Sequence, residues 1–406
     1  NTSKNHKGKS MALNLLRNSR VFYTTKLNSS GQVDTSGHTA ATTRELQVLD
    51  GFSFSQNTGQ ETITVNEAGA TPTRGQRSFN TSLEPVDFSF STYIRPKYNE
   101  GATTTAGPDA DDKVDAEEYV LWNSMSSVTG NGWTQTAGVA PTTVPFSTVS
   151  FANSNAHQLQ PFGLIIQFED VTYVIDNCAL DSATIDFGLD AIAAVAWAGK
   201  GTLMRQLATT LTISGAGSVT GGGFTAPNDF QLKDTSARYI ANKLSTMTLG
   251  SSTFGGLTGT SYGNVAITGG NITISNNLTY LTPANLGVVN IPITYFTGTR
   301  SVTANVTAYL KTGTGASAEL LKDMLNASQS STANKFEVVI KVGGNNDTRF
   351  EIAMPTTQLT IPAITSEQII ATSITMTAQG STTGAAGGNY DLEAKNEITL
   401  KYYAAA

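Results

Sequence analysis

Alternation of apolar and polar residues is the main pattern along the chain. Glycine, proline and asparagine clusters separate the alternating runs at a spacing typical of hairpins. A period of two predicts β-strands with one buried face and one polar face, so we expect a mainly β fold. The clearest runs are Leu46-Gln47-Val48-Leu49, Phe52-Ser53-Phe54-Ser55, Val86-Asp87-Phe88-Ser89-Phe90-Ser91 and Asn271-Ile272-Thr273-Ile274-Ser275.

Two short segments carry a helical pattern instead. Residues 115–122 open with Asp115, a good N-cap, and place Glu118 three positions later, as in a capping box. Residues 317–325 repeat apolar side chains at helical spacing. We therefore expect one helix in each half of the chain.

The expected elements occur twice in the same order. One helix follows the long strand in each copy, and an arginine and a serine precede that strand, as Arg77-Ser78 and as Arg300-Ser301. Chance does not reproduce a whole order of elements, so the pattern indicates an internal duplication. The matched segments are 48–54 with 266–274, 79–94 with 302–310, 164–168 and 172–175 with 336–342 and 349–353, and 183–199 with 359–380.

The duplication divides the chain into two related domains, residues 11–206 and residues 237–406. We expect each to be a β-sandwich or barrel-like fold with one flanking helix. Residues 207–236 hold two glycine clusters, a composition typical of a linker or a long loop. Residues 1–10 are polar and basic, which predicts a flexible N-terminal arm.

Composition then narrows the classes of function. Only 14% of the 406 residues are charged and the net charge is -6, with dispersed Lys and Arg, so we expect no specific binding of nucleic acid. No apolar stretch approaches the ~20 residues needed to span a bilayer, so no membrane partner is expected. A single cysteine, Cys178, excludes a disulfide framework within the chain. The absence of a signal-peptide pattern predicts assembly inside a cell.

Residues that could carry nucleophilic chemistry are few. His6, His38 and His157 lie in polar segments, and nothing around Cys178 marks an activated thiol. Asp176 would raise the pKa of that thiol if it lies close. No catalytic residue is predicted.

Three segments resemble ligand-binding loops and fail in detail. Residues 198–202 lack the upstream glycine of a Walker loop, and residues 215–220 end on Thr220 where a dinucleotide loop needs glycine. The acidic run 109–113 departs from a calcium loop at Lys113 and Val114. We therefore expect no cofactor-binding residues and no metal site.

Seven segments of the chain share a pattern with one known family: 11–22, 48–54, 83–96, 183–187, 192–199, 287–293 and 296–305. They resemble the tail tube proteins, also called major tail proteins, of tailed bacteriophages. The resemblance implies β-sandwich or barrel-like domains whose inner sheets join between neighbours into a ring with an open lumen, and rings that stack into a tube. Many members carry one domain per chain and form hexameric rings. Two domains per chain leave a trimeric ring with pseudo-sixfold symmetry and a hexameric ring as alternatives.

The resemblance also implies a function. It is that of a structural virion protein, assembled in the host cytoplasm, whose tube conducts viral DNA during ejection without binding it specifically. The implied partners are further copies of the chain, a tape measure protein, and tail terminator and tip proteins. Two alternatives stay open: an adhesin or surface binding module built of two β-sandwiches, and a tail-associated hydrolase, for which no carboxylate pair or triad is found.

Overall fold

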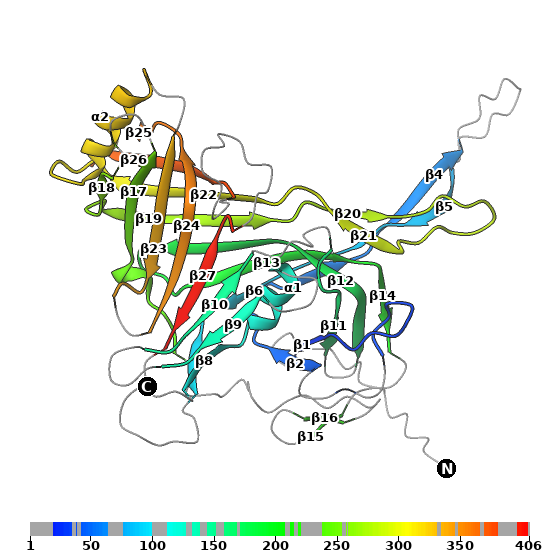
Figure 1. Ribbon diagram of the computed structural model, residues 1–406. Coiled ribbons are helices and arrows are strands. Elements are labelled where there is room, and N and C mark those ends of the chain that lie inside the picture. Colours follow the sequence, from blue (N-terminus) through cyan, green and yellow to red (C-terminus); the bar gives the residue numbers. More distant parts are fainter. Residues whose placement is uncertain are drawn as a thin grey trace, which may run out of the picture.

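The structure is a computed structural model and is mainly β, with two helices, as expected (Figure 1). The expected arm, residues 1–10, lies outside the described residues, as do residues 11–18 of the resemblance and most of the expected linker. The described part of that linker forms a small hairpin of β15 (Thr212–Ser214) and β16 (Ser218–Thr220). The described residues are 19–34, 38, 42–63, 76–99, 112–126, 132–138, 144–151, 158–168, 171–207, 212–214, 218–220, 238–253, 257, 259–330, 334–345, 348–365, 369–380 and 396–404.

We call the elements from β1 to β14 the first half and those from β17 to β27 the second half. The first half contains β1 (Arg20–Thr24), β2 (Thr43–Leu46), β3 (Ser53–Ser55), β4 (Thr58–Ile63), β5 (Arg77–Leu83), β6 (Val86–Tyr93), β7 (Pro96–Asn99), β8 (Lys113–Ala116), α1 (Tyr119–Ser126), β9 (Trp133–Thr136), β10 (Phe146–Ser150), β11 (Phe162–Gln167), β12 (Thr172–Gly188), β13 (Ala194–Gly201) and β14 (Leu203–Gln206).

The second half begins after a short 3-10 turn, Asn242–Leu244. It contains β17 (Thr246–Thr253), β18 (Ser261–Tyr262), β19 (Ile267–Ser275), β20 (Leu278–Leu281), β21 (Thr294–Thr297), β22 (Ser301–Tyr309), α2 (Ser317–Ala327), β23 (Lys335–Val342), β24 (Arg349–Leu359), β25 (Ala363–Thr365), β26 (Ala371–Ala378) and β27 (Thr399–Tyr403).

One antiparallel sheet runs through both halves, in the order β3-β6-β13-β12-β19-β22-β26-β25. We call it the shared sheet. Its apolar side chains point into the core, where Phe88, Trp197, Ile185, Ile272 and Met376 are all buried. The two halves therefore form one structure rather than two separate bodies.

Two further sheets cover the core. The first-half sheet has the order β14-β12-β11-β1-β2, and the second-half sheet has the order β9-β10-β27-β24-β23-β17-β18. The long strands β12 and β24 each begin in one of these sheets and end in the shared sheet. Asn177, with a φ of 47°, lies where β12 passes from one to the other.

Strand pairing recurs between the halves. β11-β12, β12-β13 and β13-β6 in the first half correspond to β23-β24, β24-β26 and β26-β22 in the second. By the same pattern β14, which pairs with the start of β12, corresponds to β27, which pairs with the start of β24. The order of elements expected from the duplicated sequence pattern is thus present as equivalent pairings.

The expected start of the first helix is wrong. Asp115 and Ala116 belong to β8, which pairs with β7, and α1 begins only at Tyr119. In β8, Val114 and Ala116 are buried in the core, and this tertiary packing outweighs the local capping signal. Glu118 is fully buried instead of exposed at a helix terminus. The second helix lies where it was expected.

The expected long strand 79–94 is also wrong in its extent. It divides into β5 and β6 at Glu84 and Pro85, since proline has no N–H to donate within a sheet. The match of Arg77-Ser78 with Arg300-Ser301 fails for the same reason. Arg77 begins β5, whose partner is β4, whereas Ser301 begins β22 in the shared sheet.

Candidate assembly interface

The shared sheet crosses from one half to the other at the pair β12-β19. Ile185 lies opposite Ile272, and both side chains are completely buried. On the other face of the sheet, Thr184 Oγ1 lies 3.1 Å from Thr273 Oγ1. We call this junction the inner seam. It joins the halves by a full antiparallel ladder with apolar packing beneath it.

Asn276 fixes the end of the inner seam. Its Nδ2 donates to the carbonyl oxygens of Leu180 at 3.1 Å and Met125 at 3.3 Å, and its side chain is buried. Its backbone N–H donates to Asp181 O at 2.7 Å, while Asp181 Oδ1 accepts from the N–H of Leu278 at 2.8 Å. The first residues of the β20–β21 hairpin are therefore bonded directly to the first half.

A second junction, which we call the outer seam, joins the halves on the far side of the core. β10 of the first half pairs with β27, close to the C-terminus. Arg300 reinforces this junction, since its Nη2 lies 2.6 Å from Glu397 Oε2 and 2.9 Å from the carbonyl oxygen of Phe151. Both charged side chains are largely buried, which makes this pair more than a surface contact.

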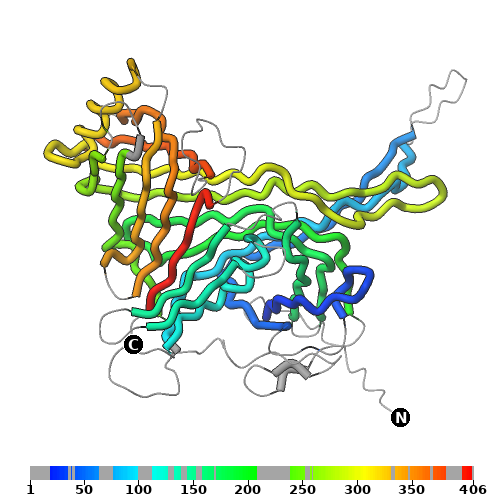
Figure 2. Tube along the Cα trace, viewed as in Figure 1, coloured from blue at the N-terminus to red at the C-terminus, as the bar shows by residue number. Residues whose placement is uncertain are grey.

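Two hairpins, β4–β5 and β20–β21, leave the body on the same side of the molecule (Figure 2). The second crosses onto the first half: Tyr280 Oη donates to Lys200 O at 2.7 Å, and Tyr295 Oη donates to Leu159 O at 2.7 Å. Asn290, in its loop, exchanges backbone hydrogen bonds with Leu83 and Thr81. The β20–β21 hairpin carries a set of exposed apolar side chains: Leu281, Leu286, Val288, Val289, Ile291, Ile293 and Phe296.

The face of the shared sheet that points away from the core is rich in hydroxyl and amide groups. Side-chain contacts run from strand to strand across it, between Ser53 and Ser89, Thr184 and Thr273, and Thr375 and Asn305. Lys200, the cation that the described strands place on this face, lies 2.6 Å from the carboxylate of Asp87. Asp186 is a further acid there, and partial burial raises its pKa.

The shared sheet ends on two open edges. Within the described residues, the three-residue strand β3 pairs only with β6, and the three-residue strand β25 pairs only with β26. Their outer backbone groups are a template for another strand. Exposed isoleucines surround the second edge: Ile361, Ile364, Ile369 and Ile370.

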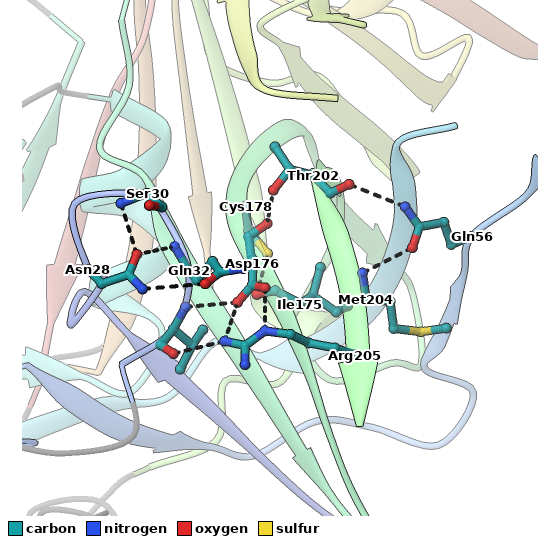
Figure 3. Close-up of polar contacts among 11 residues, drawn as sticks. Asn28, Ser30, Gln32, Gln56, Ile175, Asp176, Cys178, Thr202, Met204 and Arg205 are labelled. Atoms are coloured by element: carbon teal, nitrogen blue, oxygen red, sulfur yellow. Dashed lines mark hydrogen bonds and ion pairs between the residues drawn. The ribbon is translucent and has the colours of Figure 1, made fainter. Parts of the chain in front are cut away.

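The outer edge of β14 has different hydrogen-bond partners from the outer edge of its counterpart β27. The carboxamide of Gln56, directly after β3, donates to Thr202 O at 3.2 Å and accepts from the N–H of Met204 at 3.0 Å (Figure 3). On its other side, Arg205 Nε lies 2.6 Å from Asp176 Oδ2. The Gln56 side chain thus bonds to the outer edge of β14. At the corresponding edge of β27, the whole strand β10 pairs instead.

The residues considered for chemistry form no catalytic arrangement among the described residues, although Cys178 lies beside residues 198–202 where β12 pairs with β13. Cys178 is buried in β12, and burial, with a smaller contribution from Asp176, raises the pKa of its thiol. His38 bonds to Asp34 O and to the hydroxyls of Thr24 and Thr43, and burial lowers its pKa. Residues 198–202 lie in β13 and just beyond it. His6, His157 and residues 109–111 lie outside the described residues.

Over the described part of the chain, no group of three or more His, Cys, Asp or Glu side chains is arranged to hold a metal ion. Neither α1 nor α2, the helices of the described residues, is long and apolar enough to cross a membrane.

Comparison with known proteins decides between the interpretations. No family model matches the chain. Over 381 residues the chain is 32% identical to the tail tube protein pb6 of Escherichia phage T5, an alignment that covers 90% of this chain and 72% of that protein. The chain belongs to the tail tube proteins of tailed bacteriophages. It is a structural protein of the virion tail and not an enzyme, which decides against both the adhesin and the hydrolase.

Several residues on which these interfaces depend carry no signal in the sequence that marks them. Gln56, Asn276 and Glu397 are polar residues in segments with no motif, and their partners lie far away in the sequence. Only the single polar break after the alternating run 271–275 hinted at Asn276. The exposed apolar segment 287–293 was recognised as part of the family resemblance and not as a surface.

Proposed function

We propose that three chains form each ring of the tail tube, with six equivalent half-chains around the axis. The repeated pairing pattern supports this, because each half supplies an equivalent part of the shared sheet. Open edges at both ends of that sheet suit a head-to-tail ring, in which closure removes every edge. We also propose that the domain division 11–206, 207–236 and 237–406 reflects fusion of two ancestral tube subunits.

The hydroxyl-rich face of the shared sheet is proposed to line the lumen. Each Lys or Arg that pairs with a phosphate releases counterions and adds salt-dependent affinity, so a cationic wall would hold DNA in place. On this face Lys200 already forms an ion pair with Asp87. The Ser, Thr and Asn side chains are uncharged and add no ionic attraction to the phosphates. The wall therefore lets DNA pass without capturing it.

The remaining partners follow from the proposed role. A tube that fills a tail needs a tape measure protein in its lumen during assembly, and terminator and tip proteins at its two ends. The exposed apolar side chains of the β20–β21 hairpin are suited to contacts between stacked rings. We place assembly of these parts in the host cytoplasm.

A reconstruction of tubes assembled from the purified chain tests this proposal. The expected map has three chains per ring, with Ser89, Thr303 and Thr307 on the inner wall. Six chains in one ring would overturn the stoichiometry. A continuous belt of Lys and Arg on the inner wall would overturn the proposed lumen.

A further inference from the structure

The junction between the two halves of one chain is also a template for the junction between neighbouring chains. From the repeat of strand registers we infer that β25 of one chain pairs antiparallel with β3 of the next, with Ile364 opposite Phe54 and Ala363 opposite Ser55. This inference rests on the proposed head-to-tail ring and specifies the surface that closes it.

A β-bulge aligns the two halves with each other. In the first half Leu180 lies opposite Gly199 and the next paired residues are Ser182 and Ala198, which leaves one extra residue on the long strand. In the second half Leu359 lies opposite Met376, and pairing resumes at Ala363 and Ser373, again with one extra residue. Gly199 therefore corresponds to Met376, and Leu180 to Leu359.

The registers of the paired strands then carry this correspondence across the sheet. Gly199 lies opposite Phe88, and Met376 lies opposite Ala304, so Phe88 corresponds to Ala304. Phe88 lies opposite Phe54, and Ala304 lies opposite Ile272, so Phe54 of β3 corresponds to Ile272 of β19.

The same bulge relates the residues of β12, on the other side of the inner seam, to those of β24 and β25. Four residues beyond Leu180 and Leu359, Thr184 corresponds to Ala363, and Ile185 corresponds to Ile364. The inner seam places Ile185 opposite Ile272 and Thr184 opposite Thr273. Its copy between two chains places Ile364 opposite Phe54 and Ala363 opposite Ser55.

Three independent features of the single chain agree with this pairing. β25 and β3 each have three residues, and the copied register pairs Ala363–Thr365 with Ser53–Ser55 over their whole length. Among the residues that the structure describes, each strand is paired along one edge only. Ile364 is 55% exposed whereas its counterpart Ile185 is 0% exposed, so the single chain leaves open the position that the inner seam buries.

The copied junction lacks an outer seam. In the second half α2 ends at Ala327 and β23 begins at Lys335, a connection too short for a counterpart of the β9–β10 hairpin. Gln56 already bonds to the edge of β14 that such a hairpin would pair with. The chain–chain junction thus depends on β25 and β3 more than the inner seam depends on β12 and β19.

Cysteine cross-linking tests the register. Directly opposite residues of an antiparallel pair have Cα atoms about 4.5–5.5 Å apart, within disulfide range, while diagonal neighbours lie about 7–8 Å apart. Tubes of S55C/A363C, once oxidised, are expected to give dimers and closed trimers on a denaturing gel without reductant. The native Cys178 is buried and does not compete.

Two matched variants serve as controls. T184C/T273C carries the same pair in the inner seam and is expected to close within one chain, without oligomers. S53C/A363C moves the partner two residues along the same face and is expected to cross-link at least tenfold less. Efficient cross-linking of S53C/A363C in place of S55C/A363C would overturn the register.

The result also separates this inference from the proposed ring. Intact S55C/A363C tubes without cross-links, while T184C/T273C closes, would overturn the pairing and leave the three-chain ring standing. Cross-linked species that extend to six chains would support the pairing and overturn the three-chain ring. If S55C/A363C does not assemble, I364D is the second variant: we expect a folded chain with an unchanged Tm that no longer forms rings, and normal I364D tubes would overturn the pairing.

Discussion

The indole Nε1 of Trp122, on α1 of the first half, donates a 2.6 Å hydrogen bond to Tyr402 Oη on β27 of the second half. Both side chains are completely buried. The indole of Trp122 also meets that of Trp197 edge-on, 4.6 Å between ring centroids, so the helix connects the shared sheet to the second-half sheet. This contact joins a helix of the first half to the last strand of the second half.

Tyr402→Phe is expected to destabilise the chain by about 1–3 kcal/mol, because it leaves the Trp122 N–H buried without an acceptor. Urea unfolding followed by tryptophan fluorescence measures the change. Tyr309→Phe, at an exposed tyrosine of β22, should change the free energy of unfolding by less than about 0.5 kcal/mol. Equal effects of the two substitutions would contradict the role of this hydrogen bond.

Asn276→Asp is expected to destabilise the chain more than Asn276→Ala. The carboxylate would face the carbonyl oxygens of Leu180 and Met125 and could not donate to either, whereas alanine removes only the donor. Thermal unfolding at pH 8 measures both. Asn285→Asp, at an exposed position, is the control. An aspartate variant as stable as the alanine variant would show that the carbonyl pair does not set the preference for asparagine.

Burial raises the pKa of Glu118 to about 7 from its ordinary 4.5. Between these values the folded chain keeps a proton that the unfolded chain has lost, so stability falls as pH rises through this window. Glu118→Gln removes the titration, and its stability should vary less between pH 5 and pH 8, with a gain on the order of 3 kcal/mol at most at pH 8.

The pH profile of Tm measures this effect, with the exposed Glu84→Gln as control. Glu117, whose pKa burial raises to about 8, adds the same trend, so the profile of E118Q should become flatter without becoming flat. A variant with an unchanged profile would contradict a buried, protonated Glu118.

Leu286→Ser with Val289→Ser is expected to weaken tube formation and leave the Tm unchanged. Both side chains are exposed on the β20–β21 hairpin, Val289 by 51%, so the single chain loses little buried apolar surface. Negative-stain microscopy and sedimentation measure tube yield. The control L286M/V289I keeps the apolar surface and should assemble normally. Serine variants with full tube yield would show that another surface stacks the rings.

How far the sequence alone predicts this fold depends on the range of each interaction. Alternation located β6 and β19 because a strand with one buried face has apolar residues at every second position, a pattern visible in the local sequence. The start of α1 was misplaced, since β8 is held by a partner strand that a capping signal does not reveal. The order of most duplicated elements was predicted, but not the break of the expected strand 79–94 into β5 and β6.

The seams could not be predicted in the same way. β10 and β27 pair although they lie far apart in the sequence, and no pattern within either strand identifies the other as its partner. Gln56 and Asn276 act through single amide groups that no spacing announces. An alternating pattern shows that a strand has a buried face, but not which edge of another strand it meets.

The β9–β10 hairpin gives the proposed ring two kinds of joint. Within a chain, where this hairpin is present, the inner and outer seams both hold the two halves together. Between chains, the short β25–β3 ladder alone holds the neighbours together. A bent or stretched tail would therefore open first at the three chain–chain joints of each ring, and each of these joints would act as a hinge. Fusion of two subunits in this way lets one protein be rigid within its covalent unit and compliant between units, a combination that six identical joints do not provide.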